Sequence, residues 1–273
     1  MNVKHSSTGQ YMNASLFQTK VSHDELEKKD FLLPNDHAID EMDPAKLMMI
    51  YWRYINTIQY LCRNQQRLGL ITDGGKEVCF DESYRPRNPC LVYSFGSHNQ
   101  FDFEVDVHRH LGCEVHTFDP SMKKVGKRIN TFTTFHSYGL GARDFYDTRK
   151  KWNMKRLTSI IKELGHSERY IDILKIDIEG DEWCALPDII QSAELFRVRQ
   201  LCIEVHFGRN KICYNPQQNI TSYEQIKVLK MLYTSGFRTF MRDHNAVRVI
   251  ELFHTQISPL NELSMVNVLL KEL

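Results

Sequence analysis

The sequence predicts an α/β fold in which a mainly parallel β-sheet is covered by helices on both faces. The chain has 273 residues, enough for a large buried core, and its 42% hydrophobic and 25% charged residues are ordinary for a globular protein. From Cys90 onward, short apolar runs alternate with segments of helical periodicity. The runs are rich in Val, Ile and Leu, which is typical of parallel strands buried on both faces.

The region before this pattern is predicted to be a tail followed by one long helix. Residues 1–42 are polar and lack periodicity, so we expect a tail that is partly disordered or laid over the domain. Asp43 and Pro44 have the order of an N-cap followed by proline at the first helical position. A helical stripe of apolar residues follows, and Gly69 would end the helix. The stripe consists of Leu47, Tyr51, Tyr54, Ile58 and Leu61.

The remaining chain is expected to form one domain, residues 43–273, with a helix and loop over residues 43–89 and an α/β core over residues 90–273. Two core segments have clear helical signals. In Lys151–Leu164, apolar residues recur at i, i+3, i+4 and i+7, and Tyr223–Ser235 opens with a capping box from Ser222 to Gln225 and stops at Gly236. The predicted strands are Leu91–Phe95, Glu114–Phe118, Thr133–Tyr138, Ile171–Asp177, Leu201–His206, Phe237–Met241 and Met265–Leu270.

The ends of the first two strands have the pattern of a nucleoside site. In an open α/β sheet the ligand binds beyond the carboxyl ends of the strands, where the strand order reverses. Gly96, directly after the first strand, lets the backbone turn tightly and approach a ligand without a Cβ atom. Asp119 ends the second strand roughly 20 residues later, the spacing at which an acid accepts hydrogen bonds from ribose hydroxyls. The alternative for Asp119-Pro120 is a turn that ends the strand.

The fourth strand ends in a dense acidic turn that contains Asp177, Glu179, Asp181 and Glu182. Neighbouring carboxylates make one another costlier to ionise unless a cation, a donor network or water offsets the charge. Capping of the next helix would account for some of these side chains. We expect the others to have a function.

Composition and local pattern exclude several classes of protein. The net charge of +1 gives no support for a nucleic-acid binder, which normally shows a basic excess. We find neither a signal peptide nor an apolar run long enough to span a membrane, so the default expectation is a cytoplasmic protein. There are seven cysteines, but none has zinc-ligand spacing, and no metal site is expected. Cys79 and Cys90 would either form a disulfide or remain two buried thiols.

Four short blocks follow one another along the core. They are Val92-Tyr93-Ser94-Phe95-Gly96, His116-Thr117-Phe118-Asp119-Pro120-Ser121, Tyr138-Gly139-Leu140-Gly141 and Leu174-Lys175-Ile176-Asp177-Ile178-Glu179-Gly180-Asp181-Glu182-Trp183. In this order and spacing they resemble the FkbM-like methyltransferases, most closely the group of methyltransferase-like protein 24. The resemblance runs from about residue 78 to the C-terminus, and the last block is the most specific. Cys79 and Cys90 are also similar to positions of that group.

This resemblance implies a Rossmann-like class I methyltransferase fold, with a seven-stranded, mostly parallel sheet whose last strand is antiparallel. It also implies S-adenosylmethionine as the cofactor, bound over the first two strand ends, and it allows a location in the secretory pathway. By position, the methionine part would be lined by Phe95, Gly96, Ser97 and Asn99. Asp119, with Pro120 beside it, would hold the ribose, Gly139 would border the adenine, and Asp177 would lie near the methionine amino group or the acceptor. The chain departs from the usual pattern in having a single glycine in this first loop, which contains His98.

Residues that close the fourth and fifth strands are the candidates for catalysis. Methyl transfer needs in-line alignment, and a hydroxyl acceptor would also benefit from a general base. We expect Glu179, Glu204 and His206 to act here, and His206 is the better base by its ordinary pKa. The alternatives are a structural or substrate-binding histidine, or a hard divalent cation held by Asp177, Glu204 and His206. By analogy with FkbM-like relatives, the acceptor is a sugar, a glycan or another small hydroxylated compound.

Three other functions share this architecture. A nucleotide-sugar-dependent glycosyltransferase would use an acidic strand end, such as Asp177 and Glu179, and would not need the pair Gly96 and Asp119. An NAD-dependent oxidoreductase should have a fuller glycine fingerprint. A non-catalytic methyltransferase-fold binding module would keep the cofactor without turnover.

Overall fold

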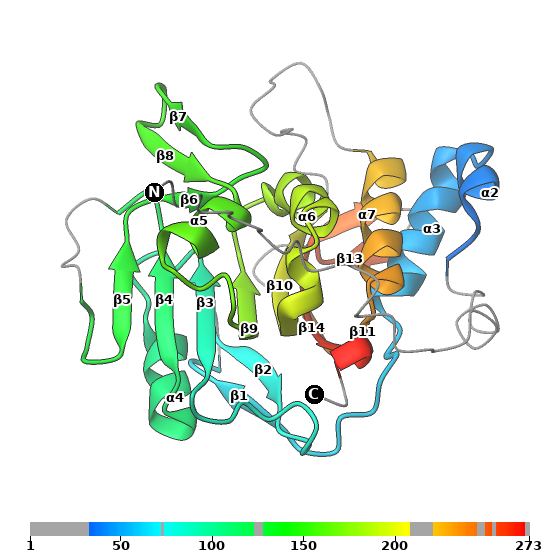
Figure 1. Cartoon of the computed structure of the whole chain (residues 1–273). Helices are drawn as coiled ribbons and strands as arrows, with labels where there is room; N and C mark the ends of the chain where they lie inside the picture. Colours follow the sequence, from blue (N-terminus) through cyan, green and yellow to red (C-terminus); the bar gives the residue numbers. More distant parts are fainter. Residues whose placement is uncertain are drawn as a thin grey trace, which may run out of the picture.

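A seven-stranded sheet forms the centre of the protein, with the strand order β11-β14-β10-β9-β3-β4-β5 (Figure 1). The computed structural model describes residues 33–71, 74–122, 128–207, 221–244, 249–252 and 255–270. All pairs from β10 to β5 are parallel, whereas β14 is antiparallel to both of its neighbours. This arrangement confirms the prediction of a mostly parallel sheet whose last strand is antiparallel.

Each predicted strand of the core overlaps a strand of this sheet. The strands are β3 (Leu91–Phe95), β4 (Glu114–Phe118), β5 (Thr133–His136), β9 (Ile171–Ile176), β10 (Val198–His206), β11 (Phe237–His244) and β14 (Leu260–Asn267). β3 and β4 have the predicted limits. The prediction for the last strand is displaced, because β14 begins at Leu260 and the short 3-10 helix η3 (Val268–Leu270) follows it.

Helices cover both faces of the sheet, as predicted. Four of them share a core cluster with one set of alternate strand residues, which includes Tyr93 and Phe95; they are α3 (Pro44–Ile55), α5 (Leu157–Glu163), α6 (Glu182–Gln191) and α7 (Ser222–Thr234). The opposite face packs with α4 (Asp102–Leu111) and the hairpin of β1 (Gln65–Leu68) and β2 (Lys76–Cys79). Val92 and Val115 belong to this second cluster, since successive residues of a strand face opposite sides.

The first long helix, α3, is shorter than predicted. It begins as expected, with Asp43 as N-cap and Pro44 in the first turn, but it ends at Ile55. Ile58 and Leu61, which continue the apolar stripe in the sequence, are 48% and 74% exposed. The prediction failed because the segment that follows forms β1, which pairs with β2 rather than extending the helix.

Part of the predicted tail is packed onto the domain. The short helix α2 (Asp36–Asp40) lies in this region, and Leu33 and Ile39 are buried in the same core cluster as α3. The packed part of the chain therefore begins before residue 43. Residues 1–32 of the predicted tail lie outside the described residues.

Two other helix predictions are wrong in their limits. The first part of Lys151–Leu164 is a strand, β8 (Trp152–Lys155), which pairs with β6 (Gly139–Leu140) and β7 (Phe145–Asp147) in a three-stranded sheet. Only the second part of that segment is helical. The capping box of α7 consists of Thr221 and Glu224, one residue before the predicted pair.

The cysteines are paired differently from either alternative for Cys79 and Cys90. Disulfides join Cys62 to Cys79 and Cys90 to Cys113, so both the predicted pair and the two free thiols are wrong. Sequence spacing did not show this, because each pair is brought together by strand packing. Cys184 is also disulfide-bonded, and Cys202 is the free cysteine among the described residues.

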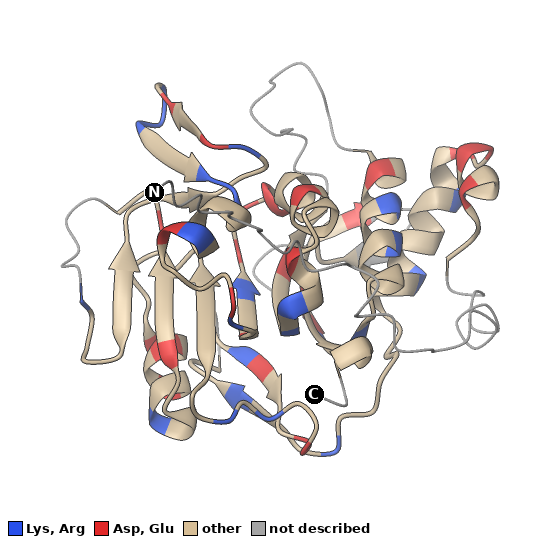
Figure 2. Cartoon of the chain, viewed as in Figure 1, with Lys and Arg blue, Asp and Glu red and all other residues tan. Residues whose placement is uncertain are grey.

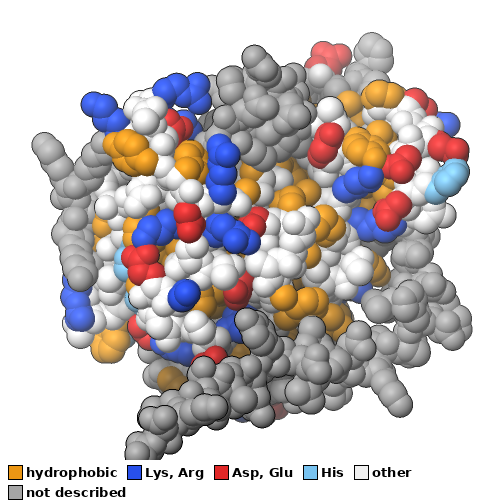
Figure 3. Space-filling model, turned by 45° about the horizontal axis from the view of Figure 1, so that its top comes forward, with side chains coloured by type: hydrophobic (Ala, Val, Ile, Leu, Met, Phe, Trp, Pro, Cys, Tyr) orange, Lys and Arg blue, Asp and Glu red, His pale blue; other side chains and the backbone are white. Residues whose placement is uncertain are grey.

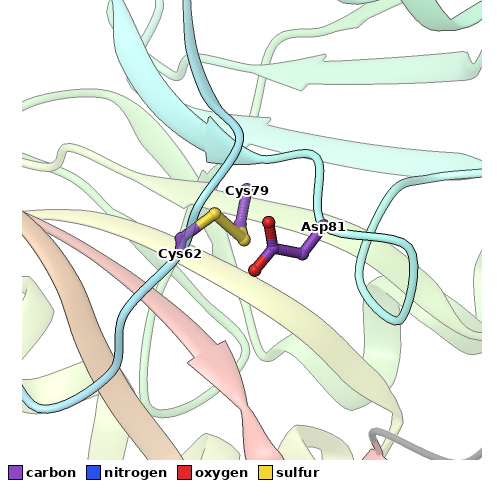
Figure 4. A group of neighbouring side chains, drawn as sticks. All are labelled: Cys62, Cys79 and Asp81. Carbon is purple, nitrogen blue, oxygen red and sulfur yellow. A yellow bond between two sulfur atoms is a disulfide. The ribbon is translucent and has the colours of Figure 1, made fainter.

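The first disulfide lies next to an acidic side chain, as Figure 4 shows. The carboxylate of Asp81 accepts hydrogen bonds from the backbone N–H groups of Arg63 and Asn64. Both sulfur atoms are bonded to each other, so they do not offer thiolate ligands. This group is therefore a structural junction between β2 and the segment before β1, and not a metal site.

Charged residues of both signs are spread over the layers of the protein (Figure 2), in keeping with the net charge of +1. Within the part of the chain that the structure describes, no helix has the length and apolar character needed to cross a bilayer.

Candidate active site

The carboxyl ends of the parallel strands meet at one edge of the sheet, the upper edge in Figure 1. From β3 the chain proceeds outward through β4 and β5, and it then returns to the other side of β3 as β9 and β10. The strand order therefore reverses between β3 and β9. Open α/β sheets bind their ligands beyond the strand ends at this position.

Gly96 connects the two sides of this switch point. Its φ angle is +84°, and a Cβ atom at this position would lie 1.7 Å from the carbonyl oxygen of Asp177. The N–H of Gly96 also donates to the carbonyl oxygen of Phe118, at 2.9 Å. Only glycine fits between these two strand ends. The loop after β3 is thus held directly against the acidic turn after β9.

The next residues of this loop are held by Asp119. His98 and Asn99 have left-handed φ angles of 43° and 64°, and Oδ2 of Asp119 accepts a hydrogen bond of 2.8 Å from the N–H of His98. Its Oδ1 accepts from the N–H and the hydroxyl of Ser121, at 2.8 and 2.6 Å. A carboxylate offers about four lone-pair positions. Asp119 therefore shapes the loop and keeps about one position for a further donor.

Three other predicted cofactor residues, Ser97, Asn99 and Gly139, differ in their surroundings. A Cβ atom on Gly139 would be 2.8 Å from Cγ of Pro120, so the backbone of Gly139 packs against the residue after Asp119. Ser97 is buried, whereas Asn99 is exposed.

The side chain of Phe95, the first residue of the predicted methionine-binding segment, lies beneath the loop. The side chain is fully buried and stacks on Phe118, with the ring centroids 4.4 Å apart. Its carbonyl oxygen accepts a hydrogen bond from the N–H of Asp177. Phe95 therefore supports the loop from below, because the end of β3 is enclosed between β4 and β9.

The ends of β9 and β10 bring Asp177, Glu204 and His206 together, with their ligand atoms all within 4.8 Å of one another. Nε2 of His206 lies 3.3 Å from Oε2 of Glu204. Sequence reasoning missed two further members of this group. The ammonium of Lys76, on β2, lies 3.4 Å from Oδ2 of Asp177 and also contacts Glu262, the antiparallel partner of Glu204 on β14.

His206 is fixed by the first turn of α6. Oε1 of Glu182 accepts a hydrogen bond from the backbone N–H of His206 and lies 3.0 Å from its Nδ1, while the indole N–H of Trp183 donates to the carbonyl oxygen of His206. Burial disfavours the charged imidazole, but the hydrogen bond and charge of Glu182 outweigh it and raise the pKa of His206 to about 9. His206 is therefore a cation at neutral pH. The argument from its ordinary pKa, which made it the better base, does not hold here.

Glu204 and Asp177 share one proton at neutral pH. Burial, followed by the charges of Asp177 and Glu262, raises the pKa of Glu204 to about 8. Burial would also raise the pKa of Asp177, but Lys76, Lys175 and a hydrogen bond from Glu204 lower it to about 2. The protonated carboxyl of Glu204 thus donates to the carboxylate of Asp177.

The rest of the acidic turn is partly structural. Asp181 is the N-cap residue of α6 but makes no cap hydrogen bond with its side chain, and burial raises its pKa to about 6. Glu182 instead accepts a hydrogen bond from the N–H of Gly180. Glu179 has a left-handed φ angle of 62°, and its largely exposed carboxylate lies 3.8 Å from Nε2 of His206. Of the four acids, Asp177, Glu179 and Glu182 therefore lie against His206.

A rim of basic and aromatic side chains lies beside this edge, on β7, β8 and the segments next to these strands. The guanidinium of Arg143 lies over Phe145, and the ammonium groups of Lys150 and Lys155 lie over Trp152 and Tyr138. Figure 3, in which the upper edge of the sheet is turned forward, shows Lys and Arg next to hydrophobic side chains over this region.

Comparison with known proteins agrees with this geometry. The family model of a methyltransferase domain matches residues 17–253, which is most of the chain. The chain therefore belongs to this methyltransferase family.

Curated relatives identify the branch of the family that the chain resembles. It is 33% identical over 171 residues to probable methyltransferase-like protein 24 of Homo sapiens, covering 57% of this chain and 46% of that protein. For the protein of the same name from Rattus norvegicus, the identity is 31% over 205 residues, covering 70% of this chain and 56% of the relative. The chain spans about half the length of these relatives. The resemblance inferred from the sequence motifs is confirmed.

Two solved structures are similar over much of the chain. One is the methyltransferase FkbM from Methylobacillus flagellatus KT, with a TM-score of 0.43 and 11% identity over 88% of this chain and 58% of that chain. The other is a protein of the NADB-Rossmann superfamily from Streptococcus agalactiae, with a TM-score of 0.35 and 10% identity over 67% of this chain and 64% of that chain. Because both scores are below 0.5, neither similarity leads to a conclusion about function.

Proposed function

We propose that this methyltransferase uses S-adenosylmethionine and transfers the methyl group to a hydroxyl oxygen of a sugar or another small acceptor. The observation that carries the proposal is the contact between Gly96 and the carbonyl group of Asp177. This contact brings the loop after β3 beside the side chains of Asp177, Glu204 and His206, which supports a single site for cofactor and acceptor. Cofactor and acceptor would then meet at the strand-order switch between β3 and β9.

The chain offers a fitting set of groups for the cofactor. The glycine loop leaves no Cβ atom between the strand ends, and the exposed residues His98 and Asn99 face outward from it. Asp119 would accept a hydrogen bond from a ribose hydroxyl through its remaining lone-pair position. Gly139 would let the adenine approach the backbone beside Pro120. Bound S-adenosylmethionine would supply a methyl group on a positively charged sulfur.

Glu204 is the residue that we assign as general base. In its ionised form it would accept the proton from the acceptor hydroxyl as the oxygen bonds to the methyl carbon and the bond from that carbon to sulfur breaks. A base whose pKa is near 8 is well matched to a reaction near neutral pH. His206 and Lys76 would offset the negative charge that appears on Glu204. Glu179, whose exposed carboxylate lies 3.8 Å from Nε2 of His206, would contact the acceptor.

Cofactor binding is tested by calorimetric titration with S-adenosylmethionine and S-adenosylhomocysteine. The parent protein is expected to bind both, and Asp119→Ala is expected to weaken binding because it removes the ribose acceptor and releases the loop at His98. Asp36→Ala, in the exposed helix α2, serves as the matched control and should bind like the parent. A folded parent protein that binds neither compound would refute the proposal that S-adenosylmethionine is the cofactor.

The acceptor side is tested by turnover against a panel of sugars and hydroxylated compounds. Glu204→Gln and His206→Ala are expected to keep the affinity for S-adenosylhomocysteine and to lose turnover. Full cofactor binding without turnover of any acceptor by the parent would favour a non-catalytic binding module instead. Loss of cofactor binding in His206→Ala would contradict its assignment to the acceptor side.

The disulfides also bear on the location of the protein. We infer that the chain works in an oxidising compartment, since stable disulfides are rare where thiols are kept reduced. This differs from the default expectation of a cytoplasmic protein and agrees with the location that the family resemblance allows. Mass spectrometry of the protein isolated from its native cells under alkylating conditions would test it, because a fully alkylated set of cysteines would contradict the inference.

A further inference from the structure

A second group of polar side chains lies at the opposite end of β4, on the face of the sheet that α5 covers. Glu114 and His116 project from the same side of β4, because residues two apart on a strand face the same way. His166 reaches them from the turn after α5, where Gly165 has a left-handed φ angle of 74°. The ligand atoms of the three residues all lie within 4.8 Å of one another.

The distances within this group are close to those around a single metal ion. Oε1 of Glu114 lies 3.0 Å from Nε2 of His116 and 3.8 Å from Nε2 of His166. Two ligands of a tetrahedral Zn²⁺ ion, each bonded at about 2.0–2.1 Å, lie about 3.4 Å apart. The observed separations fall on either side of this value. A separation of 3.8 Å is too long for a hydrogen bond, so a bond to Glu114 does not explain the orientation of His166.

In both imidazoles, Nδ1, the nitrogen that points away from Glu114, has a hydrogen-bond partner. Nδ1 of His116 lies 2.9 Å from Nε2 of His136, and Nδ1 of His166 lies 2.7 Å from the hydroxyl of Tyr93. Histidines that bind metals almost always have such a partner, which fixes the ring and leaves Nε2 for the ion. His116 and His166 are only 7% and 8% exposed, so neither ring is a mobile surface side chain.

The carboxylate is oriented in the same manner. Arg169 donates to Oε2 of Glu114 at 2.5 Å, which leaves Oε1 turned toward the two imidazoles. The side chain of Glu114 is 45% exposed, so water has access to this side of the group. Water would therefore be available as a fourth ligand.

We propose that Glu114, His116 and His166 bind a divalent transition metal ion of the Zn²⁺ type, with water as the fourth ligand. Two imidazole nitrogens and one carboxylate oxygen suit such an ion, whereas Ca²⁺ and Mg²⁺ prefer oxygen ligands throughout. Glu114 begins β4 and Asp119 follows its end, a distance of about 16 Å along the strand. The ion would fasten β4 to the turn after α5, away from the candidate active site. The proposal is therefore independent of the proposed function.

Titration of chelator-treated protein with ZnCl₂ tests this site. We expect one Zn²⁺ ion per chain and a higher midpoint of thermal unfolding in its presence. His166→Gln should lower the affinity more than about a hundredfold and abolish the thermal shift, and Glu114→Gln should act in the same direction. His110→Gln, at an exposed position of α4, is the matched control and should behave like the parent.

Three results would overturn the proposal. The first is a folded parent protein that binds no Zn²⁺, and the second is unchanged binding in both His166→Gln and Glu114→Gln. The third is loss of binding in Glu204→Gln alone, which would move the ion to the candidate active site. Circular dichroism shows whether each variant is folded. If His166→Gln does not fold, the zinc affinity of Glu114→Gln, which preserves the shape of the side chain, tests the proposal alone. Titration with S-adenosylhomocysteine on the same samples reports separately on the proposed function.

Discussion

Replacing Glu204 with glutamine is expected to change how the stability of the protein depends on pH. In the folded protein, the pKa of Glu204 is raised from 4.5 to about 8, because the group is buried beside Asp177 and Glu262. The folded state thus keeps a proton that the unfolded chain has already released. The stability that this proton provides is fully present below about pH 4.5 and is lost as the pH rises toward 8.

The size of the effect follows from the two pKa values. Between about pH 5 and pH 8, ionisation of Glu204 favours the unfolded state by roughly two and a half powers of ten. At about 1.4 kcal/mol for each power of ten, the parent protein loses on the order of 3 kcal/mol of unfolding free energy from this group. Glutamine has no proton to lose, and its amide N–H can replace the hydrogen bond to Asp177.

Urea unfolding at a series of pH values measures this difference. The unfolding free energy of Glu204→Gln, relative to that of the parent, should rise by about 3 kcal/mol between about pH 5 and pH 8. Glu82→Gln, which replaces a glutamate whose side chain is 91% exposed, is measured in parallel as the matched control. A difference for Glu204→Gln that stays constant over this range would refute a protonated Glu204 in the folded state.

Three further predictions use other parts of the structure. Gly96→Ala should destabilise the protein by at least about 3 kcal/mol in urea unfolding and abolish cofactor binding. Gly165→Ala is the control, because Gly165 also has a positive φ angle but no atom lies within 4 Å of the added Cβ, and it should cost only about 1 kcal/mol. Equal costs would contradict the close contact at Gly96. Replacing Cys62 and Cys79 by alanine should lower the unfolding free energy by about 3 kcal/mol for a sequence separation of 17 residues, and this difference should disappear under reducing conditions. Turnover of a methyl acceptor should rise with pH through an apparent pKa near 8 if Glu204 is the base, and a flat profile in the parent enzyme would refute that assignment.

The parts of the fold that were predictable are those that leave a local pattern in the sequence. β3 is buried throughout and mostly apolar, β4 has the apolar residues Val115 and Phe118, and the turns after the two strands begin at Gly96 and Asp119. The helical stripe of α3 was visible for the same reason. Its apparent extension through Ile58 and Leu61 was misleading, because periodicity does not reveal that the following segment pairs with β2.

The charge states at the strand ends were not predictable, because they depend on residues far apart in the sequence. Lys76 lies on a short polar strand about 100 residues before Asp177, and nothing in its neighbourhood marks it as a buried cation. His206 shows the same limitation. Its ordinary pKa suggested a base, whereas the contact with Glu182 in the preceding helix α6 makes it a cation. The group of Glu114, His116 and His166 escaped notice because spacing alone does not bring the turn after α5 to β4.

The β1–β2 hairpin connects the first disulfide with the candidate active site. Cys79 is bound to Cys62, and its backbone N–H donates to the side chain of Gln200 on β10, so the end of β2 is fastened at two points. Lys76 lies three residues earlier on the same strand, where it is the cation nearest to Asp177. If β2 were loosened, Asp177 would lose that cation and its pKa would rise, so that the proton now held by Glu204 would be shared more evenly. The hairpin therefore helps to determine which of the two carboxyl groups can act as a base, although sequence analysis assigned its first strand to a helix and its second strand to a loop.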